Sequence, residues 1–331
     1  MSNIVYLVGI MLLSGLWAYG ITPVIMRLAE RYKQYDPQNE RKVHTRRVSR
    51  LGGIAVYSGF AVGFSVLTYL MLSGRIESSF QPVTMFAIFL GGTLYFLLGL
   101  LDDFLELSAN FKFVIMVMIA LLVVLTGVRV SSLFGVYLLP VWVGVILTVV
   151  WIVGIVNTIN FVDGLDGLAT GVGLLASIAF FIIAIVRGEW FTAFFLVCII
   201  GALAGFLPFN FFPARIFLGD SGSLTIGYFL AVVGVIGLYK QVTIIALAVP
   251  LMILALPIAD TAFAIVRRLA RRVPVTRPDR RHIHHRILAL FGRSANDTAK
   301  MMDGPAHRNA VIACYVIAFV FASVAVYIGI Q

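Results

Sequence analysis

The chain has 331 residues, of which 61% are hydrophobic and only 12% charged, and its mean hydropathy is +1.01. A soluble protein of this length needs far more polar surface, so the composition excludes a soluble globular domain. The net charge is +10, and the placement of the cations along the chain matters more than their sum. The apolar runs are long and continuous and do not alternate with period two, which favours membrane-spanning helices over a β-barrel.

Ten apolar segments follow one another along the chain, and each is predicted to be a membrane-spanning helix. They cover about residues 4–26, 51–72, 83–101, 112–128, 140–157, 167–186, 191–208, 222–239, 243–266 and 309–330. The first is too long for a signal-peptide core and has no cationic residue before it. Cys198 and Cys314 lie inside apolar segments and predict neither a metal site nor a disulfide framework. We therefore expect an all-α polytopic membrane protein with one domain over residues 1–331.

The Lys and Arg residues are distributed unequally between the two sides of this predicted topology. Of the 25 in the chain, 21 fall on one side, and four (Arg75, Arg129, Arg187 and Lys240) fall on the other. The positive-inside rule places the first group in the cytoplasm, so both termini are predicted to face outward. The acidic clusters, the basic loop 27–50 and a His-rich loop then all lie on the cytoplasmic face.

The first acidic cluster, which consists of Asp102, Asp103 and Glu106, follows the third predicted span. On a continuing helix these carboxylates would lie near one face, where they repel one another unless a cation lies between them. Mg²⁺ takes oxygen ligands and commonly binds one or two carboxylates together with substrate phosphates. Lys112 begins the next span and could pair with this cluster or with a phosphate. A solvated helix end is the alternative interpretation.

The second cluster lies between the fifth and sixth spans and consists of Asn157, Asn160, Asp163 and Asp166, with Gly164 and Gly167 beside them. The first three recur at three-residue spacing, so they are expected to share a helix face. Glycines let the backbone approach a ligand closely. Two amides and two carboxylates suit sugar hydroxyls, a nucleoside or a metal ion, whereas an ordinary interhelical loop needs fewer polar groups.

The third cluster contains Asn210, Arg215, Phe217 and Asp220, and Asp220 comes just before a predicted span. A carboxylate there can serve a ligand site or can act only as a helix N-cap. Phe217 could stack on a base, although a lone aromatic residue at a membrane boundary is often an interface anchor.

Two basic segments are candidate phosphate-binding surfaces. Lys42 and His44 belong to the first, before the second span, and His282, His284 and His285 lie among arginines in the second. The histidines lack the partner thiols and the spacing of a structural zinc site. A surface for lipid headgroups is the alternative for both segments. Asp260 lies inside the ninth predicted span, where an acid is either functional or paired with a neighbouring helix.

Taken in order, these motifs resemble those of the polyprenyl-phosphate N-acetylhexosamine-1-phosphate transferase family, from Arg41 to Arg286. The resemblance implies transfer of a sugar 1-phosphate from UDP-N-acetylhexosamine to undecaprenyl phosphate, with release of UMP and the start of a cell-envelope polysaccharide. It also implies Mg²⁺ as cofactor, with Mn²⁺ as a substitute, and a multi-pass location among the lipids of the bacterial inner membrane. No nucleic-acid partner is expected, and a homodimer is compatible with the sequence.

The same resemblance implies roles for individual residues. Asp102 matches the proposed general base, and Asp220 matches the magnesium ligand. The remaining matches are Asp103 and Lys112 in the active site, Asn160, Asp163 and Asp166 in the active-site loop, Asn210 and Phe217 beside the uracil ring, and His282, His284 and His285 near the diphosphate or sugar. Asn157, Arg215, Lys42 and His44 complete the expected substrate-binding set.

Some positions depart from the family pattern. Glu106 stands where many members have Asp, and Arg47 and Ser49 stand where prolines are common. The motif His-Ile-His-His-Arg follows the GlcNAc-1-phosphate branch and lacks the three consecutive histidines of phospho-MurNAc-pentapeptide transferases. GlcNAc-1-phosphate transfer is therefore the preferred prediction. The alternatives are the pentapeptide transferase, a secondary transporter with polar residues at the bilayer midplane, and a lipid-binding scaffold.

Overall fold

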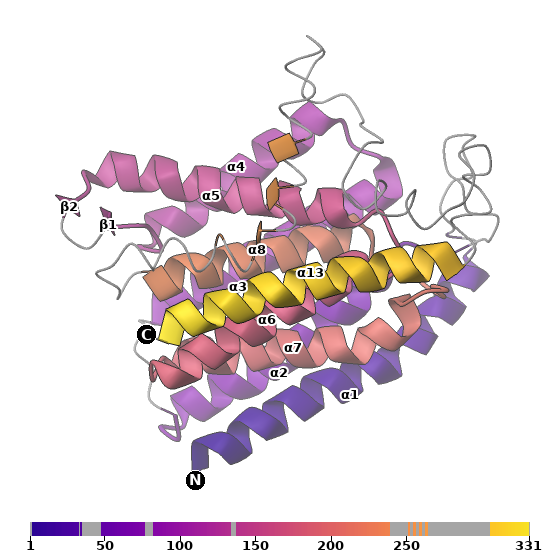
Figure 1. Ribbon diagram of the computed structural model, residues 1–331, viewed down its shortest axis with the longest axis horizontal. Helices are drawn as coiled ribbons and strands as arrows, with labels where there is room; N and C mark the ends of the chain where they lie inside the picture. Colours follow the sequence, from indigo (N-terminus) through magenta and orange to yellow (C-terminus); the bar gives the residue numbers. More distant parts are fainter. Residues whose placement is uncertain are drawn as a thin grey trace.

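The computed structural model describes residues 2–32, 34, 48–76, 82–133 and 137–238, isolated positions between 251 and 263, and residues 305–330. This part of the chain is almost entirely helical. The helices are α1 (Ser2–Arg31), α2 (Gly52–Leu72), α3 (Pro82–Leu105), α4 (Ala109–Leu125), α5 (Val141–Val162), α6 (Leu168–Val186), α7 (Trp190–Asn210), α8 (Gly219–Leu238) and α13 (Pro305–Ile330). Strands β1 (Ser132–Leu133) and β2 (Tyr137–Leu138) form a short antiparallel hairpin between α4 and α5. Figure 1 shows the long helices lying side by side as one bundle.

The described helices confirm the predicted polytopic membrane fold. Eight of them are long and apolar enough to cross a bilayer, and α4, with 17 residues, is shorter than the about 20 residues that a full span needs. Nine of the ten predicted spans coincide with helices in the described residues, with boundaries that differ by a few residues. The remaining span, the ninth at 243–266, falls mostly outside the described residues.

Helix α8 occupies the centre of the bundle. In its apolar window 94% of the residues are buried, whereas the corresponding share for α1 is 22%. Helices α3, α5, α2 and α6 all pack against α8, and α1 packs at the edge against α2 and α7 (Figure 1). The first turn of α8 carries Asp220, so one of the expected functional carboxylates stands on the best-packed element of the described fold.

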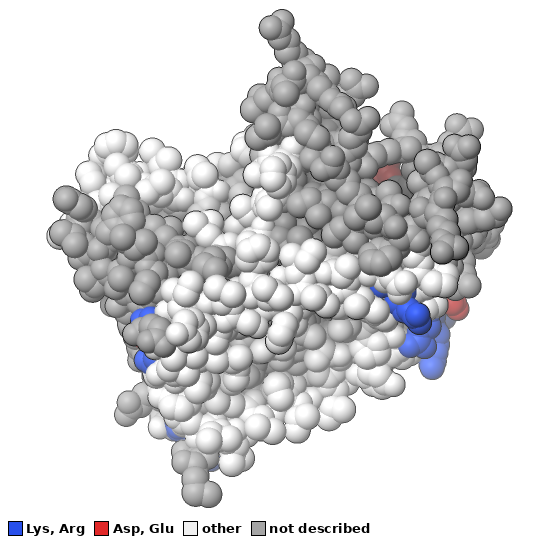
Figure 2. Space-filling view, viewed as in Figure 1, with Lys and Arg blue, Asp and Glu red and all other residues white. Residues whose placement is uncertain are grey.

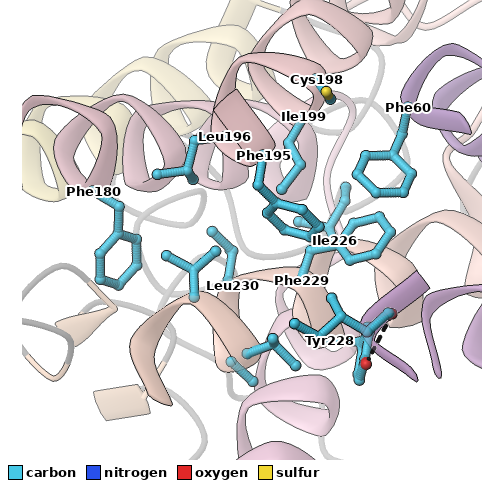
Figure 3. Close-up of a cluster of buried hydrophobic side chains, with 14 of the residues drawn as sticks. Phe60, Phe180, Phe195, Leu196, Cys198, Ile199, Ile226, Tyr228, Phe229 and Leu230 are labelled. Atoms are coloured by element: carbon cyan, nitrogen blue, oxygen red, sulfur yellow. Dashed lines mark hydrogen bonds between the residues drawn. The ribbon is translucent and has the colours of Figure 1, made fainter. Parts of the chain in front are cut away.

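Aromatic side chains fix α8 against its neighbours. Phe229 lies with its ring centroid 4.0 Å from Phe60 of α2 and 5.5 Å from Phe195 of α7 (Figure 3). Tyr228, the preceding residue of α8, donates a hydrogen bond of 3.0 Å from its hydroxyl to the carbonyl of Ile88 in α3. Such packing holds α8 at a defined depth in the bundle.

The helix ends gather at two opposite ends of the bundle. Arg187, after α6, donates from Nε to the carbonyl of Gly329 at the end of α13, 2.8 Å away. The three acidic clusters lie together at the other end, as the span count predicted. Figure 2 shows Lys and Arg near both ends of the visible face and Asp and Glu at one end, with a band between them in which the described residues are uncharged. That band is the surface that a bilayer would cover; which end faces the cytoplasm stays a prediction.

Candidate active site

Two carboxylates and one ammonium group, each from a different helix, meet at this end of the bundle. Lys112 of α4 donates from Nζ to Oδ2 of Asp102, at 2.7 Å, and to Oδ2 of Asp220, at 2.6 Å. Asp102 stands in the last turn of α3, and Asp220 in the first turn of α8. The side chain of Asp220 is 28% exposed, so solvent or a ligand can reach it. The predicted pairing of Lys112 with the acidic cluster is confirmed, and its pairing with a phosphate stays a prediction.

Asp103 makes a different set of contacts from its neighbour Asp102. Its Oδ1 accepts the backbone N–H of Asp220 at 2.8 Å, and its Oδ2 accepts that of Ser221 at 3.0 Å. These N–H groups belong to the first turn of α8, where backbone donors have no partner within the helix. Gly219 before them has φ +74°, and a Cβ there would crowd the Asp103 carboxylate. Asp103 therefore joins the end of α3 to the start of α8.

The expectation that Glu106 shares a helix face with Asp102 and Asp103 is wrong. Helix α3 ends at Leu105, and Glu106 adopts a left-handed conformation with φ +48°, exposed to solvent. The turn is closed by the N–H of Glu106, which donates to the Asp102 carbonyl at 2.9 Å. The N–H of Leu107 also donates to Asp102 Oδ1 at 2.9 Å. Asp102 thus receives donors on both carboxylate oxygens.

The two asparagines of α5 face different neighbours. Asn160 donates from Nδ2 to Oγ of Ser223 in α8, at 2.9 Å. Asn157 donates to a backbone carbonyl one turn earlier and lies 3.6 Å from the sulfur of Met116 in α4. Asp163 follows the end of α5 as its C-cap residue, so it does not continue the helix face as predicted.

Asp163 is half-buried beside the other carboxylates. Burial, followed by repulsion from Asp220 and Asp103, raises the pKa of Asp163 well above its usual value, and Arg50 acts in the opposite direction. Asp163, Asp220 and Asp103 therefore repel one another at this end of the bundle. Arg50 is the last residue of the basic loop 27–50, which the sequence marks as a candidate phosphate-binding surface, and it stands two residues before Gly52 at the start of α2.

Asp166 lies in a second network, away from the Lys112 bridge. Its side chain is 8% exposed, and its Oδ2 accepts the backbone N–H of Ala214 at 2.9 Å. Its own backbone N–H donates to Nε2 of His307, at the start of α13, at 3.0 Å. In this structure Asp166 links two loops and a helix. Sequence reasoning missed His307, whose only signal was a histidine next to a long apolar segment.

The third cluster runs from the last residue of α7, through the connecting loop, to the first turn of α8. Asn210 is 2% exposed, and both ends of its amide are engaged: Oδ1 accepts from Thr170 at 2.6 Å, and Nδ2 donates to the carbonyl of Ile216 at 3.0 Å. Asn210 stabilises this loop, and its buried amide already has partners at both its oxygen and its nitrogen. Arg215 is exposed and lies over the ring of Phe209, 4.7 Å from its centroid.

Phe217 pairs with the segment that precedes α2. Its N–H donates to the Ser49 carbonyl at 2.8 Å, and its carbonyl accepts from Gly52 at 3.0 Å. These backbone bonds tie the entry of α2 to the entry of α8. Five further expected residues, Lys42, His44, His282, His284 and His285, lie outside the described residues, as does Asp260.

The donor set suits a divalent cation that shares its ligands with a substrate. In the described part of the chain, no three His, Cys, Asp or Glu side chains converge closely enough to enclose a metal ion on their own. Asp163 nevertheless lies close enough to Asp220 and Asp103 for their negative charges to repel one another. Mg²⁺ is commonly bound by one or two carboxylates plus substrate phosphates, and this arrangement fits that pattern.

Comparison with known proteins places the chain in a family. Residues 85–238 match the model of glycosyl transferase family 4. The chain is 36% identical over 307 residues to the probable undecaprenyl-phosphate N-acetylglucosaminyl 1-phosphate transferase of Bacillus subtilis, over 91% of this chain and 79% of the relative. It is 33% identical to the decaprenyl-phosphate N-acetylglucosaminephosphotransferase of Mycolicibacterium smegmatis, over 94% of this chain and 80% of the relative.

A third relative, the undecaprenyl-phosphate alpha-N-acetylglucosaminyl 1-phosphate transferase of Thermotoga maritima, is 31% identical over 83% of this chain and 80% of its own length. Identity of 31–36% to these three relatives extends along most of the chain. The chain therefore belongs to glycosyl transferase family 4, in the branch of polyprenyl-phosphate N-acetylhexosamine-1-phosphate transferases.

Proposed function

We propose that the protein transfers N-acetylhexosamine 1-phosphate, with GlcNAc 1-phosphate as the preferred group, from the UDP-sugar to undecaprenyl phosphate. UMP is released, and the lipid-linked sugar starts a cell-envelope polysaccharide of the O-antigen, common-antigen or teichoic-acid type. The observation that carries the proposal is the bridge of Asp102, Lys112 and Asp220 at one end of an apolar bundle. The names of the relatives above support the choice of sugar and lipid.

The location of the bridge suits a reaction between a lipid and a soluble nucleotide. A polyprenyl phosphate keeps its chain in the bilayer and its phosphate at the interface, whereas a UDP-sugar arrives from the cytosol. Both reach the helix ends that carry these acids if this end faces the cytoplasm of the bacterial inner membrane. A site at the bilayer midplane, as expected for a transporter, would not bring the two together.

The transfer itself is an in-line displacement at phosphorus. An oxygen of the lipid phosphate forms a bond to the β-phosphorus of the UDP-sugar, and the bond from that phosphorus to the bridging oxygen breaks, so that UMP leaves. Asp102 accepts the proton of the lipid phosphate when that group arrives as a monoanion. Lys112, already within hydrogen-bonding distance of Asp102 and Asp220, offsets their charge and can donate to a phosphate oxygen.

Mg²⁺ is the proposed cofactor, with Asp220 as its principal ligand and Asp163 as the second carboxylate. When bound there, the cation would offset negative charge on the diphosphate. Asp103 would act indirectly, because both its oxygens hold the first turn of α8 and so orient Asp220.

The test is an assay of UMP release by the purified protein with undecaprenyl phosphate and a panel of UDP-sugars, with Mg²⁺ or with EDTA. We expect release with UDP-GlcNAc and Mg²⁺, and loss of turnover in Asp220→Asn while the protein remains folded. Near-native turnover of Asp220→Asn at saturating Mg²⁺ would contradict the assignment. Uptake of intact labelled UDP-sugar into vesicles without UMP release would instead indicate a transporter.

The panel also separates the two transferase types. Phospho-N-acetylmuramoyl-pentapeptide transferases match the chain less extensively, for example at 30% identity over 64% of it for the protein of Desulforudis audaxviator. A preference for UDP-MurNAc-pentapeptide over UDP-GlcNAc would move the protein to that type. Equal use of both donors would refute the choice of GlcNAc.

A further inference from the structure

His307, near the start of α13, is a buried histidine for which the proposed chemistry has no use. Its side chain is 0% exposed, and its Nε2 lies 3.0 Å from the backbone nitrogen of Asp166. Because a backbone N–H can only donate, Nε2 must carry a lone pair, and the imidazole is therefore neutral in this arrangement. A neutral buried imidazole with a backbone partner is suited to holding a loop in place.

The imidazole lies between two loops that each lead to an acid of the site. One loop is the turn 163–167, in which the Asp166 N–H donates to His307 and which begins with Asp163. The other is the segment 211–218, whose Phe212 ring stacks on the imidazole with centroids 4.7 Å apart. Asp166 closes the connection, because its Oδ2 accepts the N–H of Ala214 in the second loop. One side chain of α13 thus contacts both loops.

Helix α13 makes a second, separate contact with the same turn. Two helical turns beyond His307, the hydroxyl of Tyr315 donates to the carbonyl of Gly167 at 2.6 Å. Tyr315 lies against α6, the helix on which α13 mainly packs. This contact holds the far end of the turn, away from Asp163. Tyr315 offers a matched comparison, since His307 and Tyr315 each make one hydrogen bond to the backbone of the turn.

We infer that His307 is a positioning residue for the proposed sugar-phosphate transfer. It sets the turn 163–167 against the loop 211–218, and these two segments in turn place Asp163 and Asp220 relative to each other. The inference rests on the proposed function for its kinetic consequences, but its geometric content is independent of the substrate. The bland alternative is a histidine that only fills space in the core, and a phenylalanine would then serve as well.

Three variants distinguish these roles. His307→Phe keeps a ring that can stack on Phe212 but removes the acceptor, so the Asp166 N–H is left without its partner in a buried place. His307→Gln places an amide oxygen near the position of Nε2 and restores the acceptor. Tyr315→Phe removes the comparable hydrogen bond at the other end of the turn.

The first readout is hydrogen–deuterium exchange of the purified full-length protein, which needs no substrate. We expect faster exchange in peptides covering both 163–167 and 211–218 in His307→Phe, near-parental exchange in His307→Gln, and a change confined to the turn and α6 in Tyr315→Phe. Parental exchange in both loops of His307→Phe would overturn the inference. If His307→Phe does not fold, His307→Gln decides the question. Parental exchange of His307→Gln in both loops supports the inference, and faster exchange in only one of them contradicts it.

The second readout is Mn²⁺ affinity, measured by electron paramagnetic resonance, together with kcat and KM for UMP release. Residues that orient the groups around a metal commonly change affinity or activity 10–100-fold when replaced. We expect His307→Phe to lower kcat by about that factor with little change in KM for the UDP-sugar, and His307→Gln to stay within about threefold of the parent. Equal losses of kcat in His307→Phe and Tyr315→Phe at equal thermal stability would show a general structural role. If the parent releases no UMP, the proposed function fails, while exchange and Mn²⁺ affinity still decide the role of His307.

Discussion

Replacing Lys112 by Met removes the cation that lies between two carboxylates. Its ammonium makes hydrogen bonds of 2.7 Å to Asp102 and 2.6 Å to Asp220, and the three side chains are 18%, 12% and 28% exposed. Removing one partner of a buried ion pair costs about 3–5 kcal/mol, and the partial exposure of Asp220 argues for the lower end, about 3 kcal/mol. At roughly 2 °C per kcal/mol for a chain of this size, Tm in EDTA should fall by about 6 °C.

Divalent cations should compensate for the missing ammonium. In Lys112→Met, Asp220 loses the ammonium that occupies its Oδ2, so Mg²⁺ should bind to Asp220 more tightly than in the parent. A tenfold gain in affinity corresponds to about 1.4 kcal/mol, so the rise in Tm on adding Mg²⁺ should exceed that of the parent by about 3 °C. UMP release should nevertheless stay low, because a phosphate oxygen has lost its donor.

The assay is thermal unfolding in detergent with EDTA and with a series of Mg²⁺ concentrations. Lys112→Arg is the control, since it keeps the positive charge and should lose less than half as much stability. An unchanged Tm of Lys112→Met in EDTA would refute the role of the bridge in stability. A Mg²⁺ response identical to that of the parent would show that the ammonium and the divalent cation do not compete for Asp220.

Three further changes test separate parts of the site. Asp102→Asn should lower kcat about 10²–10⁴-fold and leave the affinity for the UDP-sugar within a fewfold of the parent. Part of the loss in kcat should recover at high pH, where the lipid phosphate is already a dianion. A loss of kcat that is the same at every pH would exclude the role of Asp102 as a base. Asp103→Asn can accept only one of the two α8 N–H groups, so Tm should fall by an amount equivalent to about 1–2 kcal/mol with no such pH recovery; a parental Tm would argue against the cap. For topology, a cysteine at Gly188 should react with an impermeant reagent in intact cells and one at Ser108 should not, and the reverse result would invert the orientation.

Much of the fold could be predicted because membrane helices carry a strong local signal. A run of about 20 apolar residues can hardly be anything else, and nine predicted spans coincide with described helices. The meeting of the acids also followed from the sequence, because alternating spans put every second loop at the same end. The contact of Lys112 with Asp102 and Asp220 is the clearest confirmation, since the two acids are far apart in the chain.

The individual roles of the acids were less accessible to sequence reasoning. Asp102 and Asp103 are adjacent and chemically identical, yet one receives the Lys112 ammonium and the other receives two backbone N–H groups. Which direction each side chain takes depends on where α8 begins relative to α3. Asp166 and His307 meet across 141 positions, and no local pattern encodes such a pair. Glu106 was placed on a helix that in fact ends one residue earlier.

The site is built from helix ends whose positions are set by packing elsewhere in the bundle. Asp220 and the N–H groups bound by Asp103 belong to α8, the most buried of the described spans, so the aromatic contacts around Phe229 also fix the site. Asp163 instead stands on the turn 163–167, which is hydrogen-bonded to α13 through Asp166 and Gly167. One carboxylate is therefore held by the centre of the fold and the other by its periphery. Substitutions in α13 that affect the turn should alter cation affinity and turnover with little loss of overall stability. Substitutions around α8 should alter cation affinity, turnover and stability together.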